Sequence, residues 1–158
     1  MIRVLGIDPG TRTMGWGIIE VEGRQVRCVD SGVFRSSGKD RIKKLVDIHN
    51  YVKELIKKYS PEVISVESTF FGKNVQSMIK LGEARSAAVL AGALSEIEVA
   101  TFAPREIKMA VVGNGNASKE QVAFMAQRIL NIQKKCPLDE TDALAAAYCW
   151  AQRALRAR

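Results

Sequence analysis

The chain has 158 residues and a mass of 17.4 kDa, so we expect residues 1–158 to form a single domain, and a large multidomain enzyme is excluded. Hydrophobic residues make up 47% and charged residues 26% of the chain, which excludes a disordered protein, and no apolar run reaches the about 18 residues that span a bilayer. Lys and Arg outnumber Asp and Glu by 24 to 17, and the formal charge of +7 favours a polyanionic partner such as nucleic acid.

The cysteines and the first residues indicate a reducing compartment. Cys28, Cys136 and Cys149 are odd in number and form no C-x-x-C pair, so we expect reduced, structural thiols and neither disulfides nor a thiolate zinc site. Residues 1–8 resemble a strand and lack the basic, apolar and small-residue regions of a secretory signal. We therefore expect a cytoplasmic protein with no membrane partner.

The chain begins with three segments that have the composition of strands. Residues 3–8 are mainly apolar and β-branched, and the turn Pro9-Gly10-Thr11 leads into a second such run over 14–21. A turn at 22–24 precedes the third run, over 25–34. Short turns between consecutive strands predict an antiparallel meander.

A helix and a fourth strand follow. Between residues 40 and 59 the apolar side chains recur at helical spacing, which predicts an amphipathic helix. Residues 62–67 form a short apolar run that predicts a buried strand, reached by a helical crossover and ending at Glu67. Right-handed crossovers favour a position for this strand parallel to and beside the first one.

The remainder of the chain is mainly helical and completes an α/β fold. We expect a helix rich in small residues over 74–95, a strand over 99–102, a short helix from Pro104, a helix from a Ser118–Gln121 capping box to about Leu130, and a last helix, capped by Asp139, toward Arg158. The prediction is a mixed five-stranded sheet, with three antiparallel strands followed by two parallel ones, flanked by helices.

Four acids stand where this fold would bring them together. Asp8 ends the first strand and Glu67 the fourth, so they would lie side by side at one sheet edge and repel each other. Asp139 and Asp142 lie three residues apart and share one face of the last helix. Carboxylate oxygens suit hard divalent cations such as magnesium, and two ions about 3.5 to 4 Å apart would support phosphodiester hydrolysis.

Each acid also has a purely structural interpretation. Asp8 could bond the turn that follows it, and Glu67 could lie at an exposed strand edge. Asp139 could cap the last helix, with Asp142 favoured by the helix dipole. The joint occurrence of four acids favours the metal site, and the sole histidine, His49, lies in the predicted first helix, where we expect a solvated or packing role.

Five segments of the chain carry a family resemblance. They are Gly6–Thr11 with Gly15–Gly17, Glu67–Asn74, Leu81–Arg85, Lys108 with Val111–Gly115, and Asp139–Ala145. In this order and spacing they resemble the RuvC family of bacterial Holliday-junction resolvases over nearly the whole chain. The resemblance implies an RNase H-like fold and a homodimeric crossover junction endodeoxyribonuclease, which resolves four-way DNA junctions in recombination and repair by paired, magnesium-dependent nicking.

The resemblance also assigns the catalytic residues. It implies that Asp8, Glu67, Asp139 and Asp142 are the catalytic acids and hold two Mg²⁺ ions, for which Mn²⁺ can substitute. Lys108 and Lys119 match family lysines that would hold the scissile backbone or steady the charge that develops on the phosphate. Without the resemblance, a role as solvated helix residues stays open as an alternative for both lysines.

Further DNA-binding residues are implied around the loop after the fourth strand. Phe70, or Phe71 beside it, would stack at the junction centre, a contact worth about 1 to 3 kcal/mol per base, unless both rings only pack the loop. Lys73, Asn74 and Arg85 complete the predicted DNA contacts.

The implied partners are four-way junction DNA, a second copy of the chain, and junction-binding and branch-migration proteins. The second copy would pack against the small-residue helix over 74–95.

Three other functions remain as alternatives. Asp8-Pro9-Gly10-Thr11 also resembles the first phosphate loop of actin-like and sugar kinases, but 158 residues supply only one of their two lobes. A non-catalytic nucleic-acid-binding module would gain nothing from clustered acids where phosphate docks. An RNase H-like nuclease acting on RNA or hybrid duplexes would use the same acids, and only a substrate test excludes it.

Overall fold

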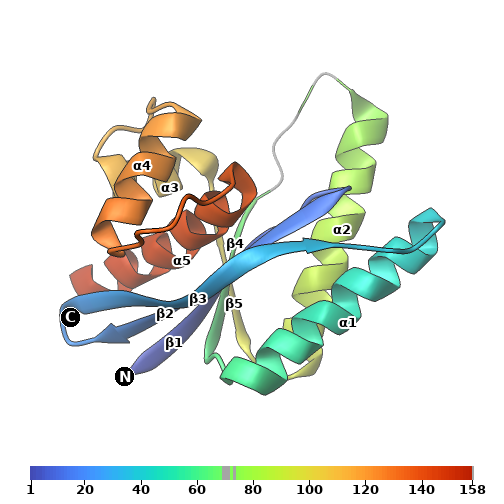
Figure 1. Ribbon diagram of the computed structural model, residues 1–158, viewed down its shortest axis with the longest axis horizontal. Coiled ribbons are helices and arrows are strands. Elements are labelled where there is room, and N and C mark those ends of the chain that lie inside the picture. Colours follow the sequence, from blue (N-terminus) through green and yellow to red (C-terminus); the bar gives the residue numbers. More distant parts are fainter. Residues whose placement is uncertain (69–71, 73, 158) are drawn as a thin grey trace.

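A mixed five-stranded sheet forms the centre of the computed structural model, which describes residues 1–68, 72 and 74–157 (Figure 1). The strands are β1 (Ile2–Asp8), β2 (Thr13–Glu22), β3 (Gln25–Arg35), β4 (Val63–Glu67) and β5 (Glu98–Phe102), and their order in the sheet is β3-β2-β1-β4-β5. The helices are α1 (Arg41–Tyr59), α2 (Val75–Leu94), α3 (Pro104–Val112), α4 (Lys119–Ile129) and α5 (Leu138–Arg156). The predicted α/β architecture is confirmed.

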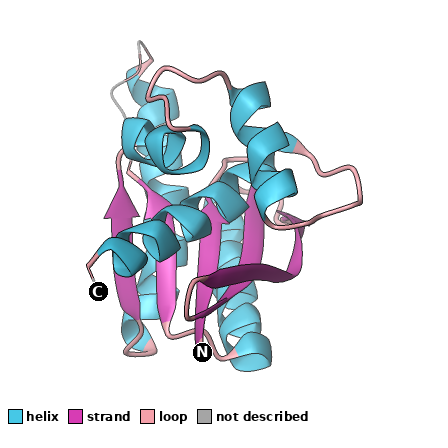
Figure 2. Cartoon of the chain, turned by 90° about the vertical axis from the view of Figure 1, so that its left-hand side faces the viewer, coloured by secondary structure: helices cyan, strands magenta, loops and turns pink. Residues whose placement is uncertain are grey.

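Helices cover both faces of the sheet. Figure 1 shows α1 and α2 on one face and α5, with α3 and α4 packed on it, on the other. Figure 2 looks onto the second face, where α5 crosses in front of the strands. No helix of the described ranges is long and apolar enough to cross a membrane.

The sheet register brings two chain segments to one edge. β1 and β2 pair antiparallel, and β4 lies parallel to β1 with Ile7 opposite Val66. β5 lies parallel to β4. Asp8 and Glu67 follow this last β1–β4 pair along their strands, so they end neighbouring strands at the same sheet edge, as the crossover rule predicts.

Alternating side chains of the strands supply two cores. On β1, Val4 packs toward α5 while its neighbour Leu5 packs toward α1 and α2. On the α5 side, helix and sheet approach very closely, since a Cβ built on Gly6 would lie 1.9 Å from the Ala143 carbonyl oxygen. A Cβ on Gly15 would lie 1.8 Å from the carbonyl oxygen of Asp139. The glycines therefore set the position of the first turns of α5 on the sheet.

The helix ends follow the sequence signals in all but one case. Asp40 caps α1, and Ser118 with Gln121 forms the predicted capping box of α4. The prediction that Asp139 caps the last helix is wrong. Pro137 occupies that position without a side-chain cap, and Asp139 is the second residue of α5.

The cysteines and the histidine have structural surroundings. All three cysteines are free, with Cys149 buried and the other two partly exposed, which agrees with the predicted reduced thiols. The half-buried His49 lies with its Nδ1 atom 3.2 Å from the Ala87 carbonyl oxygen, so it joins α1 to α2 and has a packing role.

Candidate active site

A small cavity of about 100 Å³ lies where the carboxyl ends of β1 and β4 meet α3, α4 and α5. Three acids and two lysines line it together with three apolar residues: Asp8, Glu67, Asp142, Lys108, Lys119, Pro104, Ile107 and Val122. The structure thus brings five residues that the sequence analysis singled out, from five different elements, into one place.

Among the acids of the cavity, Asp8 has the pKa that is shifted most strongly. Burial, together with the negative charges of Asp142, Asp139 and Glu67, raises its pKa from 3.8 to about 8. No side-chain hydrogen bond joins Asp8 to the described turn that follows it, so the Asx-turn interpretation is not supported. Asp8 is instead a largely buried carboxyl group that burial and the neighbouring acids keep mostly protonated at neutral pH.

The pKa values of the other two acids in the cavity, Glu67 and Asp142, are also raised. Burial raises the pKa of Glu67, and the charge of Asp142 adds to this effect. Burial also raises the pKa of Asp142, with a further contribution from Asp139, while Lys119 opposes it. Burial and the charges of neighbouring acids thus disfavour ionisation of all three carboxylates, and a positive ion in the cavity would stabilise their charged forms.

The two lysines supply the nearest positive charges of the cavity. Lys119, the first residue of α4, places its Nζ atom 3.7 Å from Oδ2 of Asp142. Lys108 lies in α3 on the cavity wall, and its charge lowers the pKa of both Glu67 and Asp142. Lys119 is exposed and Lys108 half-buried, and both lie close enough to the acids for their charges to act on them.

Asp139 lies beside the cavity and does not line it. Its Oδ2 atom accepts a hydrogen bond from Thr13 Oγ1 at 2.5 Å, which ties the start of α5 to the start of β2. Its charge still contributes to the raised pKa of Asp8 and of Asp142. Thr13 is a site residue that sequence reasoning missed, because the two partners are 126 residues apart.

The predicted DNA contacts fall into two groups. Phe70, Phe71 and Lys73 lie outside the residues that the structure describes. Asn74 caps α2 by accepting a hydrogen bond from the Ser77 amide at 3.2 Å.

The guanidinium of Arg85 has structural partners at the end of β4. It donates to the Glu67 carbonyl oxygen at 3.2 Å and to Thr101 Oγ1 at 2.9 Å. Arg85 therefore fixes the backbone at the acid that ends β4, and sequence reasoning did not anticipate this bond.

A buried polar cluster anchors the start of α5 from the other side. Glu140, between the two acids of the helix, is 4% exposed and accepts hydrogen bonds from Ser31 Oγ and Lys134 Nζ, each at 2.6 Å. Lys134 also donates to the Ser31 carbonyl oxygen at 3.2 Å. The cluster holds the first turn of α5 against β3, and with it both neighbouring acids.

The donor set of the cavity suits a hard cation. All the candidate ligands are carboxylate oxygens, which magnesium and manganese prefer over nitrogen or sulfur ligands. Within the described part of the chain, no group of three or more acid, cysteine or histidine side chains is already drawn together around one point. Magnesium is commonly held by one or two carboxylates together with waters and substrate phosphate, and the acids of the cavity could supply these carboxylates.

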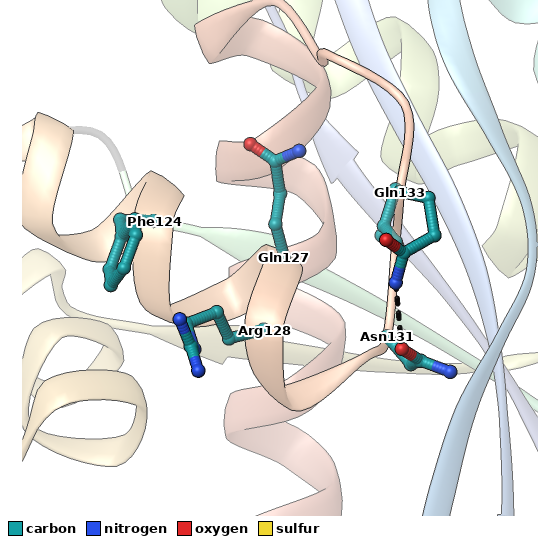
Figure 3. A pocket seen from close by; sticks show the side chains of 6 residues that line it. Phe124, Gln127, Arg128, Asn131 and Gln133 are labelled. Carbon is teal, nitrogen blue, oxygen red and sulfur yellow. Dashed lines mark hydrogen bonds between the residues drawn. The ribbon is translucent and has the colours of Figure 1, made fainter.

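A larger hollow on α4 lacks the chemistry of a hydrolytic site. It has a volume of about 440 Å³, and its lining contains no acid (Figure 3). Arg128 lies over the Phe124 ring at 5.5 Å, and Gln133 bonds the Asn131 side chain at 2.9 Å. With its one charge over an aromatic ring, this hollow offers neither metal ligands nor a general base.

Sequence comparison places the chain among RuvC proteins. The family model described as crossover junction endodeoxyribonuclease RuvC matches residues 4–150. The protein of that name from Christiangramia forsetii is 50% identical over 148 residues, which cover 92% of this chain and 77% of the relative. Its counterpart from Idiomarina loihiensis is 45% identical and covers 96% of this chain and 88% of the relative.

Solved structures agree with this grouping. Thermus thermophilus RuvC in complex with a Holliday junction substrate superposes with a TM-score of 0.91 at 32% identity, covering 99% of this chain and 97% of that one. The yeast mitochondrial Holliday junction resolvase Ydc2, at 15% identity and a TM-score of 0.71, shares the fold. The predicted RNase H-like fold is confirmed, and the chain belongs to the RuvC family of crossover junction endodeoxyribonucleases.

Proposed function

We propose that this protein is a structure-selective endodeoxyribonuclease that resolves four-way DNA junctions by paired, magnesium-dependent hydrolysis in recombination and repair. The observation that carries the proposal is the cavity at the sheet edge, where Asp8, Glu67 and Asp142 meet two lysines. The family membership supplies the reaction class, and the complex of the Thermus thermophilus relative with a Holliday junction substrate supports the substrate.

Asp8, Glu67 and Asp142 would hold the metal, with Asp139 at the edge of the site. Two bound Mg²⁺ ions would supply activation of the attacking water and stabilisation of the leaving oxygen, and Mn²⁺ could replace them. The acids must lose their protons to bind a cation, and their pKa values are raised. Metal binding should therefore release protons and strengthen from pH 6 to pH 8.

Lys108 and Lys119 would act on the DNA. Lys119 lies 3.7 Å from Asp142, so its ammonium group would be within reach of a phosphate docked beside that acid. Lys108 lines the same cavity from α3. Two positive charges on one side of the acids would orient the scissile phosphate and steady the negative charge that grows on it during hydrolysis.

A homodimer would account for paired cutting. Among the described residues, α1 and α2 expose six large apolar side chains: Ile42, Val46, Val75, Ile79, Leu90 and Leu94. A hollow of about 530 Å³ lies on these helices. We propose that a second copy covers it through the helix predicted over 74–95, so that one two-fold axis relates two active sites.

The cellular setting is also part of the proposal. The protein would work in the bacterial cytoplasm, where the chromosome lies. Junction-binding and branch-migration proteins are its expected partners.

The test uses a labelled synthetic four-way junction, a linear duplex of the same sequence and an RNA–DNA hybrid, each with magnesium or a chelator. The full-length protein should cut only the junction, symmetrically, and only with magnesium. Glu67→Gln and Asp142→Asn should bind the junction but not cut it, whereas Glu54→Gln, an exposed acid on α1, should cut at the wild-type rate.

Preferential cutting of the hybrid would replace the proposal with an RNase H-like activity. Near wild-type cutting by Glu67→Gln or Asp142→Asn would remove that acid from the metal site.

A further inference from the structure

A basic cleft of about 630 Å³ lies on the α1 and α2 side of the sheet, separate from the acidic cavity. The turn between β1 and β2 forms one wall with Gly10, Thr11 and Arg12. The start of α1 and the first turns of α2 form the others, and they contribute Lys39, Lys44 and Lys80 among other residues. The acidic cavity, at about 100 Å³, is much smaller.

Most of the positive charge in this cleft is free to meet a ligand. No acid of the described residues lies within ion-pair distance of Arg12 or of the three lysines. The lining also contains Arg41, which pairs with Glu83, and Asp40, which caps α1. Beside the Arg41–Glu83 pair, the cleft therefore presents four cations and one acid, Asp40, and this excess of positive charge suits a chain of phosphates.

The cleft is continuous with the catalytic site along the chain. Asp8 lines the acidic cavity and Gly10, two residues later, lines the cleft. A trans chain advances at most about 3.6 Å per residue, so their Cα atoms lie within about 7 Å of each other. Successive phosphates of one DNA strand advance by about 3.4 Å along the helix axis, so about two nucleotides span this distance.

The turn itself carries the sequence pattern that resembles a kinase phosphate loop. A Cβ on Gly10 would lie 2.1 Å from the Thr13 carbonyl oxygen, so the turn is too tight for any side chain at this position. In this fold the turn borders an open groove between two helices and the sheet. That setting suits an extended polyanion.

We propose that this basic cleft binds backbone phosphates of the junction strand next to the scissile phosphate, and so sets the path of the strand through the acidic cavity. The inference rests on the proposed function and adds to it a second DNA site on the opposite side of Asp8 from Lys108 and Lys119. The contacts are to the backbone and carry no base preference.

The experiment measures junction binding against salt concentration, in a chelator to prevent cutting, for wild type and for Lys44→Ala/Lys80→Ala. The log of the affinity falls linearly with the log of the salt concentration, and the slope should become shallower by about 0.9 for each phosphate contact removed. For the double variant the expected change is about 1.8. Lys53→Ala/Lys57→Ala removes the same charge from exposed positions of α1 outside the cleft and should keep the wild-type slope. Lys44→Arg/Lys80→Arg should also keep it, because arginine retains the charge.

Equal slopes for the cleft variant and the wild type would overturn the inference, and so would an equal loss in the control pair. A saturable heat on titration with ATP that only the cleft variant loses, with junction binding unchanged, would assign the cleft to a nucleotide instead. Cutting of the junction by the wild type, measured in parallel with magnesium, tests the proposed function by itself. A protein that cuts the junction while its cleft variant binds normally would keep the function and lose only this second site.

Discussion

Replacing Asp8 by asparagine should stabilise the metal-free protein at neutral and alkaline pH, although the residue is a proposed metal ligand. In the folded chain, burial and three neighbouring acids raise the pKa of Asp8 from 3.8 to about 8. The unfolded chain loses this proton near pH 4, while the folded chain keeps it until about pH 8. Over this window the unfolded state binds fewer protons, so the free energy of unfolding falls as the pH rises.

The size of the effect follows from the same pKa. Each pH unit between the two pKa values lowers the stability by about 1.4 kcal/mol, so the wild type should lose on the order of 5 kcal/mol by pH 8 relative to a chain without this carboxyl. Asp8→Asn removes the titrating group and keeps its shape. The variant should match the wild type near pH 4 and exceed it by several kcal/mol at pH 8.

Urea unfolding followed by circular dichroism at several pH values, in a chelator, measures the difference. Glu54→Gln serves as the control, because it removes an exposed acid outside the cavity but keeps Asp8, so its stability should fall with pH as that of the wild type does. Magnesium should then stabilise the wild type at pH 8 and have little effect on Asp8→Asn. A difference between wild type and Asp8→Asn that stays constant across the pH range would refute the reasoning.

Three further changes test how the site is held. Gly15→Ala would drive a methyl group into the Asp139 carbonyl oxygen, 1.8 Å away, and should cost about 1 to 3 kcal/mol in urea unfolding and slow cleavage. Glu140→Ala leaves the buried Ser31 hydroxyl without its acceptor and removes the ion pair with the exposed Lys134, which should cost about 1 to 3 kcal/mol, so an unchanged urea midpoint would contradict the anchoring role. Lys119→Ala removes the cation nearest to Asp142 and should slow single-turnover cleavage on the order of 10²-fold with junction binding largely retained.

The sheet edge of the site could be predicted because the rules that produce it are local or topological. The apolar run over 62–67 identifies a buried strand, and crossover handedness places it beside the first strand. Glu67 therefore falls next to Asp8 without any knowledge of side-chain contacts. Helix ends with a strong cap signal, such as Ser118 with Gln121, were equally predictable.

The contacts that hold the acids in place could not be predicted in this way. Thr13 bonds Asp139 across 126 residues, and Ser31 bonds Glu140 across 109. Neither pairing leaves a periodic trace in the sequence. The residue type of Asp139 fits a helix cap, but its side chain bonds Thr13 on β2, a partner that follows only from the packing of α5 on the sheet.

The central claim is that carboxylates from β1, β4 and α5 converge to hold divalent ions at the edge of the sheet. Anomalous diffraction from crystals of the full-length protein soaked in Mn²⁺ tests it most directly. The account predicts anomalous density within coordination distance of Asp8, with oxygens of Glu67 and Asp142 around it, and loss of that density in Asp8→Asn crystals. Ordered manganese bound only elsewhere, or density that persists unchanged in the variant, would contradict it.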